Sequence, residues 1–70
     1  MSDTIKLTIN GEMQSFDEQL TVSELLQRLE LIEKNLFVEY NKEPLHRDMY
    51  NETRIQSGDN IEIVMMMAGG

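Results

Sequence analysis

The chain has 70 residues with no cysteine and one histidine, and thirteen acidic against six basic residues give a formal net charge of −7. This length allows one domain with a small core, and the absence of cysteine excludes disulfides and thiol chemistry. The acidic surface disfavours nucleic acids and anionic membranes as partners. A bound metal is not expected either, because there is a single histidine and no carboxylates fall at calcium-loop spacing.

Residues 4–16 are predicted to form a β-hairpin. Three apolar residues alternate with polar ones in its first half, as in a strand with one buried face: Ile5, Leu7 and Ile9. Asn10-Gly11 follows, and this dipeptide favours a tight hairpin turn because both residues tolerate positive φ. Residues 12–16 are therefore expected to return as a second strand, with Met13 pointing into the core.

A short amphipathic helix is expected after residue 21. Thr21 and Glu24 have the spacing of a capping box, in which each side chain bonds to the backbone N–H of the other residue. Four apolar residues then fall on one helical stripe: Val22, Leu25, Leu26 and Leu29. Leu31 and Ile32 are expected to extend this apolar contact where the helix ends.

The second half of the chain is predicted to contain two further main strands. Residues 36–41 favour sheet, and Pro44 is expected to interrupt this strand because proline cannot donate to a ladder. The stretch 42–54 is interpreted as mostly loop with a short edge strand, and residues 57–60 as a turn. In the final strand two sets alternate, with Ile61, Ile63 and Met65 facing inward and Glu62, Val64 and Met66 facing outward.

These elements predict an α+β fold of the β-grasp (ubiquitin-like) type, a mixed sheet of four to five strands with one main helix packed on one face. The first and last strands would lie side by side and parallel in the middle of the sheet. Residues 1–70 form a single domain in this interpretation, with 67–70 as a flexible C-terminal tail. We find no signal-peptide pattern and no stretch as long and apolar as a membrane span, so we expect the protein in the cytoplasm.

No residue pattern in the chain predicts catalysis, a bound cofactor or a metal site. There is no phosphate-binding glycine loop, and His46 has no serine motif to serve, so it is interpreted as an exposed or packing residue. Ser23 lies inside the capping box and lacks the Asp-Ser-Leu context of prosthetic-group carriers, so it is interpreted as an ordinary first-turn serine. We therefore expect a protein without enzyme activity.

The end of the sequence, MMMAGG, carries the strongest functional signal. Gly69 and Gly70 have no Cβ, so their backbone can thread a narrow channel and present an α-carboxylate to the active site of another protein. A carboxylate becomes reactive when one oxygen is turned into a leaving group, typically by adenylation with ATP. The preceding Val64, Met66 and Met67 are interpreted as an exposed docking patch, since methionine adapts well to several partners.

With these features the sequence resembles the ThiS family, the sulfur carrier proteins of thiamine biosynthesis. The resemblance covers essentially the whole chain and is carried by three stretches: Tyr40-Asn41-Lys42-Glu43 with the following Arg47 and Tyr50, the run 57–64 (SGDNIEIV), and Ala68-Gly69-Gly70. Many relatives have a third glycine or a valine before the final pair, and proline before the arginine. This chain has Met67-Ala68 and His46 at those positions.

The resemblance implies that an E1-like adenylyltransferase uses ATP to adenylate the carboxylate of Gly70, with Gly69 and Ala68 as the tail that leads to it. Sulfur then replaces the adenylate, and the resulting thiocarboxylate donates its sulfur to thiazole synthase. The chain itself is then a co-substrate that binds no cofactor.

Three alternatives remain open. The small subunit of molybdopterin synthase uses the same terminal chemistry, although such subunits are usually somewhat longer. A ubiquitin-like modifier would be joined to lysines of its targets through Gly70. A plain β-grasp binding module would keep its partner after losing both glycines.

Overall fold

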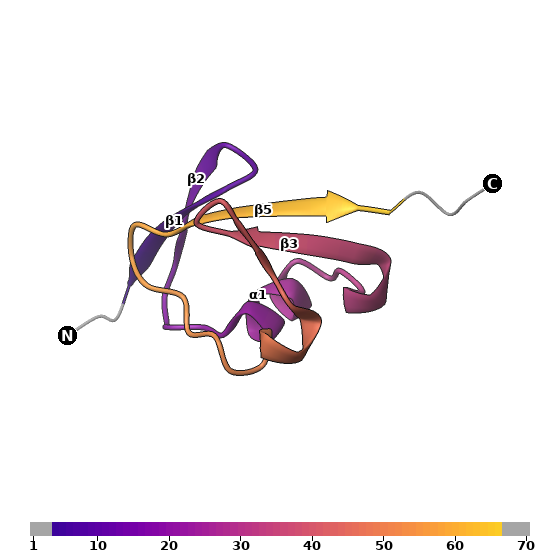
Figure 1. Ribbon diagram of the computed structural model, residues 1–70. Coiled ribbons are helices and arrows are strands. Elements are labelled where there is room, and N and C mark those ends of the chain that lie inside the picture. The colour runs from indigo at the N-terminus through magenta and orange to yellow at the C-terminus, as the bar shows by residue number, and fades with distance from the viewer. Residues whose placement is uncertain (1–3, 67–70) are drawn as a thin grey trace.

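A computed structural model of the protein describes residues 4–66. Within them, strands and helices follow in the order β1 (Ile5–Ile9), β2 (Glu12–Phe16), α1 (Val22–Arg28), the 3-10 turn η1 (Glu33–Asn35), β3 (Leu36–Tyr40), β4 (Glu43–Leu45), the 3-10 turn η2 (Arg47–Met49) and β5 (Asn60–Met65). The strands form one sheet in the order β2-β1-β5-β3-β4, and α1 packs on one face (Figure 1). β1 and β5 are parallel, and the other neighbouring pairs are antiparallel. The predicted β-grasp architecture is confirmed.

The β1–β2 hairpin forms where Asn10-Gly11 predicts it. Both turn residues have positive φ, 50° at Asn10 and 85° at Gly11, which matches the twist of the two strands. This turn pairs Thr8 with Met13, and Thr8 lies on the opposite face of β1 from the buried Leu7. The prediction that Met13 points inward is therefore wrong, and its side chain is 72% exposed.

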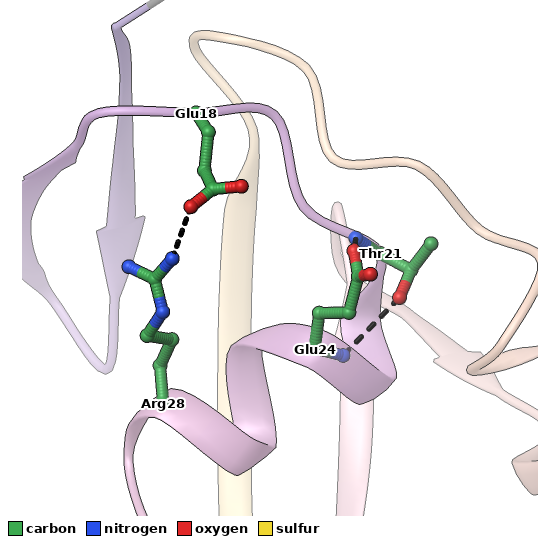
Figure 2. Close-up of polar contacts among 4 residues, drawn as sticks. All are labelled: Glu18, Thr21, Glu24 and Arg28. Atoms are coloured by element: carbon green, nitrogen blue, oxygen red, sulfur yellow. Dashed lines mark hydrogen bonds and ion pairs between the residues drawn. The ribbon is translucent and has the colours of Figure 1, made fainter.

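Helix α1 begins with the predicted capping box (Figure 2). The backbone N–H of Glu24 donates to Thr21 Oγ1 at 3.1 Å, and the N–H of Thr21 donates to Glu24 Oε1 at 2.9 Å. These bonds satisfy donors at the helix start that have no acceptor within the helix. At the other end of α1, Arg28 makes an ion pair with Glu18, which ties the helix to the segment after β2.

The core lies between α1 and the covered face of the sheet. All four residues of the predicted helical stripe contribute to it: Val22, Leu25, Leu26 and Leu29. The other buried apolar residues come from strands and loops: Ile5, Leu7, Ile9, Leu20, Leu36, Val38, Tyr50, Ile55, Ile61 and Ile63. The expected extension beyond the helix is half right, since Leu31 packs against this core whereas Ile32 is 58% exposed.

The short edge strand expected within residues 42–54 is β4, and Pro44 lies inside it. Asn41 and Lys42, with φ of 52° and 72°, form a tight turn that joins β3 to β4. The prediction that Pro44 interrupts the strand of residues 36–41 is wrong. That strand, β3, already ends at Tyr40, and Pro44 lies in β4, where it pairs with Glu39 of β3. Its missing N–H is tolerated there because β4 has a neighbouring strand on one side only.

Candidate functional site

The central strand β5 is held by hydrogen bonds along its whole length. It lies between β1 and β3, and the side-chain Oδ1 of Asn10 accepts a bond from the N–H of Ile63 at 2.7 Å. Beyond the strand, the N–H of Met66 donates to the backbone carbonyl of Asn35 at 2.8 Å. The path of the backbone is therefore fixed as far as Met66.

The segment predicted to react begins directly after this point. Gly70, Gly69 and Ala68, together with the predicted docking residue Met67, lie outside the described residues. The described part of the candidate site is therefore the end of β5 and the side chains around it.

Three exposed apolar residues lie at the end of β5 on the face of the sheet opposite α1, and we call them the outer patch: Phe37, Val64 and Met66. Phe37 and Val64 are direct cross-strand neighbours, 58% and 49% exposed. Met66 directly follows β5, and its N–H bond to Asn35 continues the pairing of β5 with the β3 side, which puts Met66 on the same side as Val64. The exposure of Val64 and Met66 is what a docking role requires, whereas Phe37 was not singled out from the sequence.

Met65 departs from its predicted position. Alternation places it on the covered side of the sheet, opposite Leu36, yet its side chain is 51% exposed. The prediction that it is buried with Ile61 and Ile63 is wrong because Met65 is the last residue of β5, at the margin of the core. Its side chain adds apolar surface beside the outer patch, on the other side of the strand.

A groove of about 390 Å³ adjoins the outer patch at the edge of the sheet, lined by Phe37, Leu45, His46, Arg47, Asp48 and Tyr50. The Arg47 guanidinium donates to the backbone carbonyl of Lys34 at 3.4 Å, which ties η2 to η1 beside the end of β5. His46 is exposed, as interpreted from the sequence, and its Nδ1 accepts a bond from the N–H of Asp48 at 3.2 Å. His46 therefore stabilises a local turn.

Residues that carry the family resemblance in the middle of the chain form a polar network at the opposite end of β5. The Tyr40 hydroxyl donates to the carboxylate of Asp59, and Asn41 Nδ2 donates to Asp59 Oδ1 at 3.3 Å. The same carboxylate accepts the N–H of Gln56 at 2.7 Å, and Asn41 Oδ1 accepts the N–H of Asn60 at 2.8 Å. These bonds join the end of β3 to the turn before β5, so this part of the motif has a structural role.

The network makes stability depend on pH in the alkaline range. Burial, followed by the hydrogen bond to Asp59 and its negative charge, raises the pKa of Tyr40 from 10.0 to about 12. The folded state therefore favours the protonated phenol. The protonated phenol of Tyr40 therefore stabilises the fold fully below pH 10, and this contribution is lost as the pH rises towards 12.

We expect the free energy of unfolding, measured by urea denaturation between pH 9 and about 12, to fall more steeply for the wild type than for Tyr40→Phe. The variant keeps the ring and loses only the titrating hydroxyl, so it is the matched control for lysine deprotonation in the same range. Parallel pH profiles for the two proteins would contradict the assigned role of Tyr40.

Two other kinds of site were considered within the part of the chain that the structure describes. No group of three or more histidine, cysteine or acidic side chains within residues 4–66 is arranged to hold a metal ion. No helix in the same range is long and apolar enough to cross a membrane. Ser23 is buried, and its hydroxyl donates to Glu33 Oε2 at 2.7 Å, which connects the start of α1 to η1.

Residues 7–70 match the ThiS family. The crystal structure of the thiamine biosynthesis protein (ThiS) from Geobacter metallireducens is 36% identical to the chain, with a TM-score of 0.81 over 94% of this chain and 100% of that one. The NMR solution structure of a thiamine biosynthesis protein from the same organism gives a TM-score of 0.79 at 36% identity, over 94% of this chain and 88% of that one.

Two curated relatives extend the comparison. A thiazole synthase from Paramagnetospirillum magneticum is 36% identical over 66 residues, which are 94% of this chain and 20% of that protein. The chain thus spans about one fifth of the length of this relative. An uncharacterized protein (ycf40) from Porphyra purpurea is 29% identical over 70 residues, which are 100% of this chain and 99% of that protein.

Proposed function

Because the chain belongs to the ThiS family, it is a sulfur carrier protein of thiamine biosynthesis rather than an enzyme, and we propose that Gly70 carries the sulfur. In the first proposed step, a carboxylate oxygen of Gly70 attacks the α-phosphorus of ATP on an E1-like adenylyltransferase, and pyrophosphate leaves. Hydrosulfide then attacks the acyl carbon, and the new C–S bond expels AMP and leaves a thiocarboxylate. Thiazole synthase finally takes this sulfur for the thiazole ring.

The observation that best supports this proposal is the fixed path of β5. The strand pairs with β1 at its first two residues and with β3 from Ile61 to Met65, and the chain stays bonded through Met66, directly before segment 67–70. A segment that follows such a strand is presented to a partner's active site from a fixed point. Glycine at positions 69 and 70 minimises the width of chain that has to fit.

The outer patch supports a docking role beside this segment. Phe37, Val64 and Met66 are exposed on one face, and exposed apolar side chains that gather in this way mark interaction surfaces. We propose that they bind the activating enzyme together with Met67, while Gly70 occupies its active site. Activation consumes ATP on that enzyme, so the carrier needs no bound cofactor, and we propose the cytoplasm as the place of the reaction.

The thiazole synthase relative supports the proposed acceptor. That protein contains, within one polypeptide, a segment 36% identical to this chain that makes up 20% of its length. Joining a carrier-like segment to a protein of this name brings donor and acceptor together, and we propose the same pairing here. This observation favours the thiamine pathway over molybdopterin synthesis.

Intact mass spectrometry tests the proposed chemistry. The wild-type protein is incubated with ATP, a sulfur source and an E1-like adenylyltransferase. We expect a mass gain equal to one oxygen exchanged for sulfur, which fragmentation assigns to Gly70. An unchanged mass with an enzyme that is active on another carrier would contradict the proposal. Conjugates of higher mass would instead indicate a ubiquitin-like modifier.

A further inference from the structure

Two glutamates lie directly opposite each other on neighbouring strands, next to the outer patch. Glu39 of β3 and Glu62 of β5 are direct cross-strand partners, and the neighbouring pair along the same face is Phe37 with Val64. The residues that alternate with them, such as Val38, are buried on the α1 side, so all four side chains lie on the face that α1 leaves uncovered (Figure 1). Within residues 4–66, neither carboxylate has an ion-pair partner.

This arrangement is unfavourable for the isolated protein. Directly opposite side chains on an antiparallel pair have Cβ atoms roughly 5 Å apart, and like charges at such positions destabilise the sheet. Glu39 is exposed and Glu62 is half-buried, so Glu62 in particular is less screened by water than a freely exposed charge. Local conflicts of this kind are expected where a surface serves binding rather than stability.

We propose that Glu39 and Glu62, together with Phe37 and Val64, form a composite docking surface for the activating enzyme, whose complementary surface presents a basic side chain between the two carboxylates. This inference rests on the proposed function. An arginine suits the position best, since its planar fork can bond to both carboxylates at once. An apolar side chain of the same enzyme covers Phe37 and Val64.

Two arguments assign this surface to the activating enzyme. An enzyme that adenylates a carboxylate binds the triphosphate of ATP with cationic groups, so its active-site entrance carries positive potential that attracts an acidic carrier. The reach of the chain also fits, because the six residues after Val64 span at most about 20 Å when extended. Val64 can therefore contact the rim of the active site while Gly70 reaches its centre.

The proposal predicts opposite effects on binding and on stability. Replacing both carboxylates in Glu39→Gln/Glu62→Gln removes the repulsion and the contact to the basic partner. In an ATP–pyrophosphate exchange assay with an E1-like adenylyltransferase that accepts the wild type, we expect KM for the carrier to rise roughly tenfold at low salt. We expect kcat to stay unchanged and the rise in KM to shrink as NaCl is added. The melting temperature of the free variant should equal or exceed that of the wild type.

Glu12→Gln/Glu52→Gln is the matched control, because it changes the net charge equally at exposed positions outside the composite surface. An equal rise in KM for both double variants would show that net charge alone matters and would overturn the proposal. Unchanged activation with slower sulfur transfer to thiazole synthase would assign the carboxylates to that partner and overturn it too. If the wild type supports no exchange with any such enzyme, the proposed function itself fails, which is a separate result.

Discussion

Deleting Gly69 and Gly70 should abolish thiocarboxylate formation while the free energy of unfolding stays within about 0.5 kcal/mol of the wild type. The deletion removes the proposed sulfur-carrying residue and shortens the chain that must reach the activating enzyme. Neither glycine has a side chain to bury, and the core residues that the structure describes all lie between Ile5 and Ile63. The measurements are intact mass spectrometry after activation and urea denaturation of both proteins.

A Gly69→Ala/Gly70→Ala variant distinguishes the effect of the length of the segment from the effect of its width. It keeps the carboxylate at its original position in the chain and adds two methyl groups that a narrow channel would have to accommodate. We expect adenylation to be slowed in this variant and absent in the deletion. A large loss of stability on deletion would contradict the view that the segment acts only in the partner's active site.

Ile61→Ala should have the largest effect on the fold itself. Ile61 is fully buried on the central strand, paired with Ile9 on one side and Tyr40 on the other. Truncating a buried isoleucine costs about 2–5 kcal/mol, against a total stability of about 4–10 kcal/mol for a domain of this length. We expect the melting temperature to fall by at least about 10 °C, measured by circular dichroism.

Val64→Ala, three positions along the same strand, is the control for this prediction. Val64 is 49% exposed on the opposite face, so its truncation should change stability by less than about 1 kcal/mol. The same variant should weaken activation through loss of contact with the enzyme. Equal destabilisation by the two substitutions would contradict the division of β5 into a core face and a docking face.

Much of the fold could be predicted because several local signals agree with one another. The alternation of residues 5–9, the Asn10-Gly11 turn and the capping box of Thr21 and Glu24 all appear in the structure as expected. Each of these signals acts over a few residues, so no knowledge of the distant chain is needed. Their order along the chain then leaves few arrangements of the sheet.

The errors arose where position depends on distant parts of the chain. Met13 is apolar, but the two-residue turn sets a register that puts it on the uncovered face. Met65 has the alternation of a core residue and lies where the core ends. Proline normally interrupts a strand. Pro44 is tolerated because β4 lies at the edge of the sheet, and that position depends on which strands pair with β3.

Only the part of the candidate site that depends on a single strand could be predicted from the sequence. Val64 and Met66 could be placed outward by alternation within one strand. Phe37 occupies the outward position in the run Leu36-Phe37-Val38, a signal available in the sequence, but its contact with Val64 follows from the pairing of β3 with β5. The pairing of the two glutamates likewise requires the cross-strand register.

The strand in the middle of the sheet is also the last strand along the described residues. Ile9 pairs with Ile61 across most of the described chain, so the sheet cannot close until β5 is available. Domains rich in such non-local pairs fold slowly, and an incomplete chain exposes apolar surface to proteases and chaperones. We therefore expect a nascent chain to become protease-resistant only once it includes β5, the strand that leads into the proposed sulfur-carrying segment.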